Sequence, residues 1–138
     1  MGGKNTMSWD CHRGGRGNNC FNEKRRLKFE VFSGCFPGRI NFSDVDGIVE
    51  IGRRFLMLEG KSSIEEIPAG QRILFEHLTE DPRWLVLVVV CDAESMRVSR
   101  LREFCKGMQS PRWEPCNLDD LRARISEWVR DSGKELRQ

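Results

Sequence analysis

Residues 47–61 read GIVEIGRRFLMLEGK, and this segment determines the architecture that we expect. Its first five residues are mostly β-branched, which is typical of a strand. Gly52-Arg53 then supplies a two-residue turn of type II′, in which glycine takes a positive φ. Arg54 to Lys61, which contains the apolar run Phe55–Leu58, returns as a second strand. The segment therefore predicts a β-hairpin.

A helix and a buried strand are expected downstream of the hairpin. A polar loop leads to Pro68, which opens a helix because its missing N–H is not needed in the first turn. The helix runs to about Thr79, and Asp81-Pro82 ends it. Trp84–Cys91 is continuously apolar, the pattern of a strand buried on both faces. The inner face of the helix is expected to consist of Ile73, Leu74, His77 and Leu78.

The C-terminal third of the chain contains one ambiguous element and one clear helix. Residues 96–104 fit a strand or a short helix, and the prolines after them favour a loop. Asn117 caps a last helix, and the tail beyond Asp131 is expected to fray. The apolar positions that repeat at helical spacing in this helix are Leu118, Leu121, Ile125, Trp128 and Val129.

The N-terminal part of the chain is basic. Residues 1–30 carry seven Lys or Arg against three acids, a net charge of +4, so the rest of the chain sums to −2. This charge fits binding to phosphates, or an ordinary solvated tail followed by the start of a helix. That helix is expected from an Asn22 cap to about Phe32, and a short extended piece over 39–42 follows.

The order of these elements predicts an α/β fold, with helices packed around a small mixed sheet. A chain of 138 residues is long enough for one core, so we expect one domain. Residues 1–19 are predicted to form a flexible basic arm and 20–92 the core. Residues 93–138 are expected to be an extension that packs on the core and ends in a helix.

The composition argues against a membrane-spanning or a disordered chain. Hydrophobic residues make up 38% and charged residues 32%, the balance of a folded domain. The longest strictly apolar run, Leu85–Cys91, is far shorter than the roughly 20 residues that span a bilayer. No apolar export signal is recognisable, so we expect a cytoplasmic protein with free thiols on its six cysteines. Cys11, His12 and Cys20 lie close together, but their spacing matches no standard zinc finger.

Three polar residues gather at one end of the predicted hairpin. Glu59 and Lys61 are two positions apart on a strand, so they project from the same face. Asp46 lies about as far before the turn as Glu59 lies after it, which makes the two near cross-strand neighbours. This arrangement is either a salt bridge on an exposed sheet face or a site of chemistry.

The chemistry that suits such a group is metal-assisted hydrolysis of phosphodiesters. Two carboxylates placed close together repel each other, and a divalent cation removes that cost. Oxygen ligands with an open coordination position suit Mg²⁺ or Mn²⁺, which activates water and offsets the charge that develops on a phosphate. Lys61 is then placed to orient the water or to neutralise the transition state.

These residues resemble the signature of the PD-(D/E)xK nuclease superfamily, which has an acid on one core strand and a (D/E)-x-K triplet on the next. Here Asp46 is followed thirteen positions later by Glu59-Gly60-Lys61. Gln71 resembles the glutamine of the VRR-NUC and Holliday-junction-resolvase-like branches, in which the similar proteins are small phage and bacterial nucleases. The resemblance covers about residues 20–92.

The resemblance implies a restriction-endonuclease-like αβββαβ core and a metal-dependent endonuclease that acts on DNA. Asp46, Glu59 and the backbone carbonyl of Gly60 would hold Mg²⁺ or Mn²⁺. Lys61 would position the water, and Gln71 would orient Lys61 or the phosphate.

The chain departs from the family pattern at two positions, and two assignments stay open. Val45 stands where the family motif has proline, and Gly60 is a weak strand residue at the x position. Asp44 is a rival for Asp46, since it shares a face with it in an extended segment. The additional acid that some members carry on the first helix corresponds to Glu30 or Glu23, and we favour Glu30 because it lies deeper in the helix.

The expected partner is nucleic acid. The residues predicted to contact its backbone are Arg53, Arg54, Arg72, Arg13 and Arg16. Small size and the resolvase-like resemblance imply a homodimer in the cytoplasm of a bacterial or phage-infected cell. The alternative function is that of an inactive nuclease-fold protein that binds nucleic acid or a host or phage protein. A third is an enzyme that works only with a phage or repair protein as partner.

Overall fold

A computed structural model describes residues 27–136, with their side chains described as far as Gly133. These residues belong to two compact units, which divide between Phe42 and Ser43. None of the helices in this described part is long and apolar enough to cross a membrane.

The first unit is held together by aromatic rings and contains no α-helix within its described residues. A short 3-10 helix, η2 (Phe29–Phe32), stands where the C-terminal half of the Asn22–Phe32 helix was expected, and the Asn22 cap lies outside the described residues. Leu27 is exposed and has no apolar helix face to join. The extended piece predicted over 39–42 is not a strand. The rings of Phe29, Phe32 and Phe36 each pack against that of Phe42.

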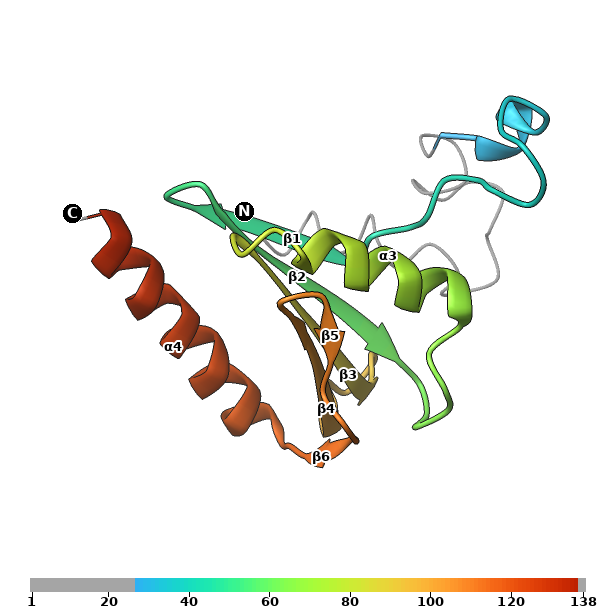
Figure 1. Ribbon diagram of the computed structural model, residues 1–138. Coiled ribbons are helices and arrows are strands. Elements are labelled where there is room, and N and C mark those ends of the chain that lie inside the picture. Colours follow the sequence, from blue (N-terminus) through green and yellow to red (C-terminus); the bar gives the residue numbers. More distant parts are fainter. Residues whose placement is uncertain (1–26, 137–138) are drawn as a thin grey trace, which may run out of the picture. The chain divides into compact units, whose positions relative to one another are not determined.

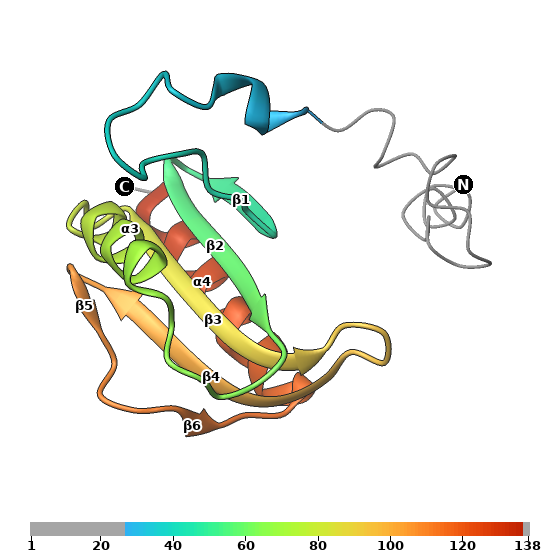
Figure 2. The same ribbon diagram turned by 90° about the vertical axis from the view of Figure 1, so that its right-hand side faces the viewer.

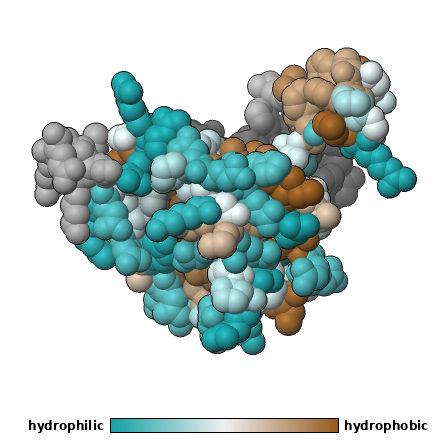
Figure 3. All heavy atoms as spheres, in the orientation of Figure 1, coloured by the Kyte–Doolittle hydropathy of each residue, from teal (hydrophilic) through white to brown (hydrophobic). Residues whose placement is uncertain are grey.

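The helix prediction fails because local packing replaces a periodic face. A helix needs apolar residues on one stripe that a neighbouring element covers. Val31, like Leu27, leaves about 70% of its surface exposed. Gly34 and Gly38 both take positive φ, so the chain turns repeatedly after η2. Much of this unit's surface is apolar, as the tan and brown spheres around η2 show (Figure 3).

The hairpin predicted for the second unit is confirmed. Strand β1 (Gly47–Ile51) pairs antiparallel with β2 (Arg54–Lys61), and Val49 lies opposite Leu56. The turn differs from the prediction, because Gly52 and Arg53 both have positive φ, at 57° and 70°. That is the pattern of a type I′ turn, whose twist also matches the strands. The Glu50 carboxylate accepts a hydrogen bond of 2.8 Å from the Arg53 N–H and so stabilises an arginine in this conformation.

A helix and a buried strand follow the hairpin, as the sequence predicts. Helix α3 (Ala69–Thr79) begins after Pro68 and leads to β3 (Trp84–Asp92). Strand β3 lies parallel to β2, with Glu59 opposite Val88. Val86, Leu87 and Val88 are fully buried, which confirms a strand covered on both faces.

The ambiguous segment after β3 is a strand. Strand β4 (Arg97–Cys105) pairs antiparallel with β3, and two short strands, β5 (Met108–Gln109) and β6 (Glu114–Pro115), pair with β4. The path through the sheet is β1-β2-β3-β4-β5, with β6 also on β4. The second unit is therefore an α/β fold with an open, mostly antiparallel six-stranded sheet.

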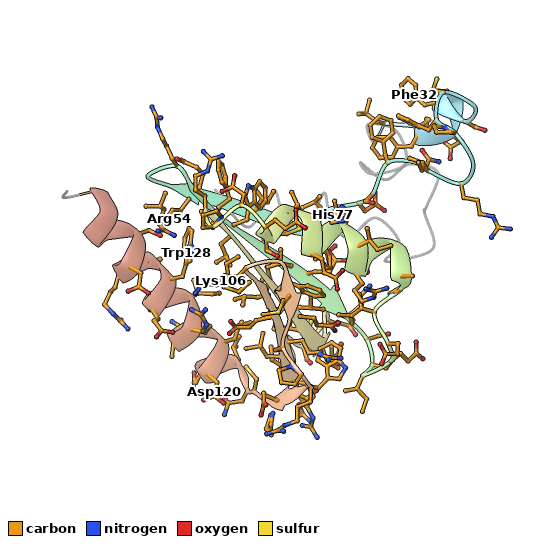
Figure 4. The ribbon with its side chains drawn as sticks, in the orientation of Figure 1. Phe32, Arg54, His77, Lys106, Asp120 and Trp128 are labelled. Carbon is orange, nitrogen blue, oxygen red and sulfur yellow. The ribbon has the colours of Figure 1, made fainter. Side chains whose placement is uncertain are left out.

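Helices α3 and α4 (Leu118–Leu136) cover opposite faces of this sheet (Figures 1 and 2). The predicted Asn117 cap is confirmed, because its side chain accepts a hydrogen bond of 2.8 Å from the Asp120 N–H. Leu121 and Trp128 are buried against the sheet, and Trp128 points from α4 toward it (Figure 4). The fraying predicted beyond Asp131 is wrong, since the helix continues to Leu136.

The predicted inner face of α3 is confirmed in part: Leu74 and Leu78 pack against the buried cluster, but the face is rotated toward Phe75. Phe75 and Thr79 are the buried residues, whereas His77 is exposed and Ile73 leaves 44% of its surface exposed (Figure 4). The ring of Phe75 packs edge-on against Phe104 of β4, with centroids 5.2 Å apart. This large contact orients the helix, so the prediction of His77 as a core residue is wrong.

Candidate functional site

The end of β2 carries polar residues on the face that α3 covers. Glu59 and Lys61 follow Met57 at intervals of two, so all three project toward α3. The carboxylate Oε2 of Glu59 lies 4.0 Å from the Nζ of Lys61. The side chain of Glu59 is only 8% exposed, and that of Lys61 is 23% exposed. The predicted shared face is therefore present, and it is largely buried rather than open to solvent.

Gln71, in the first turn of α3, joins the two residues. Its Nε2 donates a hydrogen bond of 3.0 Å to Oε2 of Glu59. Its Oε1 accepts a short hydrogen bond from Nζ of Lys61. One amide thus satisfies a carboxylate with its donor and an ammonium with its acceptor, which restricts the rotamers of both charged side chains.

Asp46 reaches β2 from the start of β1. Its Oδ2 accepts a hydrogen bond of 2.8 Å from the Gly60 N–H. This is possible because β1 begins only at Gly47, opposite Leu58, so the backbone of Gly60 lies beyond the end of β1. The Asp46 carboxylate therefore accepts the hydrogen bond that a longer β1 would accept from the Gly60 N–H.

The backbone carbonyl of Gly60 lies on the same side of β2 as this N–H. The N–H and C=O of one strand residue point in the same direction, and neighbouring residues alternate. Phe55 donates its N–H to the carbonyl of Arg83, which precedes β3. Gly60, at the opposite parity, points toward Asp46 instead, so its carbonyl can join an oxygen ligand set there.

The surroundings of the Glu59 carboxylate disfavour its negative charge. Burial, followed by the nearby Asp46 carboxylate, raises the pKa of Glu59 above its ordinary value of 4.5, and Gln71 and Lys61 only partly oppose this. The other oxygen of Glu59, Oε1, is buried and has no hydrogen-bond partner. A buried charged oxygen without a partner destabilises the fold, and a bound cation would remove the cost.

The residues present fit a hard divalent cation with few protein ligands. The donors are two carboxylates and one backbone carbonyl, all of them oxygens, which suits Mg²⁺ or Mn²⁺ that keeps several waters. No group of three or more His, Cys, Asp or Glu side chains that could hold a metal occurs between residues 27 and 133. The carbonyl of Gly60 is thus needed to extend the pair of acids.

A hollow of about 680 Å³ adjoins the site. This volume is within the range of pockets that bind small organic ligands, roughly 300–1,000 Å³. Burial and the carboxylates of Asp46 and Asp92 raise the pKa of the Cys91 thiol in its wall. The lining combines residues at the ends of β2, β3 and β4: Asp46, Gly60, Lys61, Ser62, Val90, Cys91, Asp92, Ala93, Arg97 and Ser99.

The predicted arginines of the second unit are not brought together with this group. Arg53 and Arg54 lie at the hairpin tip, about 20 Å along β2 from Lys61. Arg72 follows Gln71 but forms an ion pair of 3.1 Å with Glu76. Asp44 is exposed two positions before Asp46.

The remaining candidates stay predictions. Glu30 is exposed in η2 of the first unit. The others lie outside the described residues: Glu23, Arg13, Arg16 and the group Cys11, His12 and Cys20.

Sequence reasoning missed the β4 side of the hollow. Arg97 and Ser99 belong to the segment that fitted a strand or a short helix equally well. Taken as a strand that returns along β3, the segment would have placed Arg97 beside Asp92, as the register does. The signal was the turn-forming run Asp92-Ala93-Glu94-Ser95 between two strand patterns.

No protein-family model matches the chain, and neither does any of the curated proteins or solved structures with which it was compared.

Proposed function

We propose that the chain is a metal-dependent nuclease that hydrolyses phosphodiester bonds, most readily those of DNA. The observation that carries the proposal is the bridge that Gln71 forms between Glu59 and Lys61 beside Asp46. These four residues come from β2, from α3 and from the position before β1. A purely structural salt bridge between Glu59 and Lys61 would need neither Asp46 nor Gln71.

The fold is compatible with a reduced PD-(D/E)xK core. The hairpin, α3 and the parallel strand β3 supply the last four elements of the αβββαβ order. The first helix and first strand of that order are not formed by residues 27–42. Strands β4 to β6 and α4 extend the sheet and cover its other face instead. We propose that these additions supply the rigidity that the reduced core lacks.

The side chains have distinct roles in this proposal. Asp46, Glu59 and the carbonyl of Gly60 would hold Mg²⁺ or Mn²⁺. The bound ion would lower the pKa of a coordinated water and offset the charge that develops on the phosphate. Lys61 would hold the attacking water or the phosphate oxygen with its ammonium, which Gln71 fixes in place.

One observation favours the alternative of a nuclease-fold protein that binds nucleic acid or another protein without cutting. Only two carboxylates meet at the site, and neither a third acid nor a histidine joins them among the residues described. A site with two acids binds a cation weakly, so its metal affinity is the property that separates a working enzyme from a binding protein.

Cleavage of DNA by purified protein tests the proposal. Supercoiled plasmid, single-stranded DNA and a four-way junction would each be incubated with Mg²⁺, with Mn²⁺ and with EDTA. We expect metal-dependent cutting that Lys61→Ala lowers by about 10²–10³-fold. Lys106→Ala, which removes an exposed lysine from the turn after β4, is the matched control and should cut normally. Folded protein that cuts none of the three substrates with either metal would overturn the enzyme and leave the binding protein.

The oligomeric state and partners are part of the same proposal. A homodimer would give so small a chain two sites on one nucleic acid and a larger surface for it. Light scattering coupled to size-exclusion chromatography measures the mass directly. Activity that appears only after addition of a phage or repair protein would point to an enzyme that depends on a larger assembly.

A further inference from the structure

The hollow beside the candidate site extends beyond the residues assigned to chemistry. Asp46, Gly60 and Lys61 line one side of it. Arg97 and Ser99, near the start of β4, line another. Strands β2 and β4 are separated by β3, so these two sides are two strand spacings apart, about 10 Å. A ligand that fills the hollow therefore contacts groups well away from the metal-binding oxygens.

A β-bulge gives the wall at β4 its shape. The register of β3 and β4 shifts between Val90, which pairs with Arg100, and Cys91, which pairs with Val98. Ser99 is the extra residue on β4, and its hydroxyl donates a hydrogen bond of 3.5 Å to the Val90 carbonyl. Bulges often redirect side chains next to functional sites. Here the bulge places Arg97 and Ser99 beside the hollow together.

Arg97 is the cation of the hollow that is left available for a ligand. The ammonium of Lys61 already contacts Gln71 and Glu59. The guanidinium of Arg97 is exposed and, within the described part of the chain, has neither a hydrogen-bond nor an ion-pair partner. Asp92 lies opposite it in the register, but its carboxylate accepts a hydrogen bond of 3.1 Å from the Glu94 N–H. An arginine whose guanidinium has no protein partner presents its whole donor fork to an anion.

We propose that Arg97 forms a phosphate subsite for the nucleic-acid backbone, in the wall of the hollow beside the bulge at Ser99. This inference rests on the proposed nuclease function and assigns its substrate contact. The subsite binds a phosphodiester next to the one that is cut, because it lies too far from Asp46 and Glu59 to share the same phosphate. It reads no base, so its contribution is the same for every sequence. This contact fixes the position of the nucleic-acid strand along the hollow.

Binding and cleavage are measured separately to test this subsite. A short labelled single-stranded oligonucleotide is titrated with protein in EDTA, at several salt concentrations, and cleavage is followed in parallel with Mg²⁺. Arg97→Ala is expected to weaken binding by about tenfold and to reduce the slope of log K against log salt by about one. Arg97→Lys should recover part of the affinity, since it keeps the charge but loses the fork. Arg122→Ala, which removes an exposed arginine from α4, is the matched control and should bind as wild type.

The outcomes separate the subsite from the enzyme. Equal affinity and equal salt slope for Arg97→Ala and Arg122→Ala, in a protein that cuts, would overturn the subsite and leave the nuclease. Weaker binding by Arg97→Ala in a protein that does not cut would support the subsite and overturn the nuclease. A wild-type protein that neither binds nor cuts would overturn both. Thermal unfolding of each variant confirms that it is folded.

Discussion

The two faces of the sheet are covered by helices in different ways. On the face of α4, β2 presents Leu56 and Leu58, and the helix covers them with Leu121 and Trp128 in one apolar cluster. On the face of α3, the side chains of β2 change from the apolar Met57 to the charged residues at the end of the strand. Gln71, in the first turn of α3, forms hydrogen bonds with both of these charged residues. Both faces belong to the same strands, so the difference lies in the side chains and not in the backbone.

The two faces differ in how their side chains contribute to stability. An apolar residue at position 59 would extend the core, whereas a buried carboxylate with one unpartnered oxygen costs free energy. Burial raises its pKa, and perturbed carboxylates of this kind occur preferentially at functional sites. The α4 face thus stabilises the fold, and the end of the α3 face is where we look for chemistry.

The largest expected effect is on the α4 face, where the comparison assigns stability alone. Trp128→Ala should lower the free energy of unfolding by about 3–5 kcal/mol, because it leaves a cavity among buried residues. Urea denaturation measures the change, with Val129→Ala, a largely exposed neighbour on α4, as control. Any cleavage activity should persist per folded molecule. Loss of activity in a variant that remains folded would contradict the division between the two faces.

The elements on both faces could largely be predicted, because alternating apolar and polar residues, or an unbroken apolar run, indicate directly which side chains are buried. The strands of the hairpin and β3 have unbroken patterns of this kind, and the Asn117 cap marks the start of α4. The turn type was not predictable in the same way, since Gly52 alone satisfies a II′ turn and the positive φ of Arg53 depends on the Glu50 carboxylate. The prediction of the first helix failed because Leu27 and Val31, its expected apolar face, are both largely exposed.

A divalent cation should stabilise the α3 face selectively. At about a hundred times its Kd, Mg²⁺ or Mn²⁺ would add about 2.7 kcal/mol to the stability of the native state. The shift in Tm should disappear in Asp46→Asn and in Glu59→Gln, and should remain in Asp44→Asn. Thermal unfolding with and without metal measures it.

The same experiment decides between the two rival acids. A shift that survives Asp46→Asn and is lost in Asp44→Asn would transfer the ligand role to Asp44. A shift that survives all three substitutions would show that the ion binds elsewhere and would remove the metal from this site.

Glu59→Gln should stabilise the metal-free protein at neutral pH by about 1 kcal/mol, since it removes a buried charge and keeps the shape. The native pKa of Glu59 lies above its unfolded value of 4.5. Between these two values the native state binds more protons than the unfolded state, so the stability of wild type falls as the pH rises through this window. Glu59→Gln has no carboxylate at this position, so its stability does not fall in this way. Its advantage should therefore be absent below pH 4.5, grow through the window and be complete above the native pKa.

Urea denaturation across this pH range checks the prediction, with Glu65→Gln in the exposed loop before α3 as control. The control should show no such window. Parallel pH profiles for wild type and Glu59→Gln would mean that the Glu59 carboxylate is not perturbed, and the contrast between the two faces would lose its electrostatic basis.

The site could be predicted in part. Spacing on a strand was enough to place Glu59 and Lys61 on one face, and the hairpin brought Asp46 to them. Arg97 was missed because its segment fits two kinds of element, although the turn-forming residues before it favour a strand that returns along β3. The β-bulge that directs it depends on pairing with β3, a contact between residues that no local pattern records.

The smallest expected effect concerns an exposed residue of α3 and tests which residues of this helix face the sheet. His77→Ala should change the free energy of unfolding by less than about 0.5 kcal/mol, because this side chain is exposed. Phe75→Ala, two positions earlier, should cost about 3–5 kcal/mol, since its ring is buried against Phe104. Urea denaturation of both variants measures the two free energies of unfolding and so shows which of the two residues faces the sheet. A large loss for His77→Ala with a small one for Phe75→Ala would turn the helix by about 160° and would carry Gln71 away from Glu59 and Lys61.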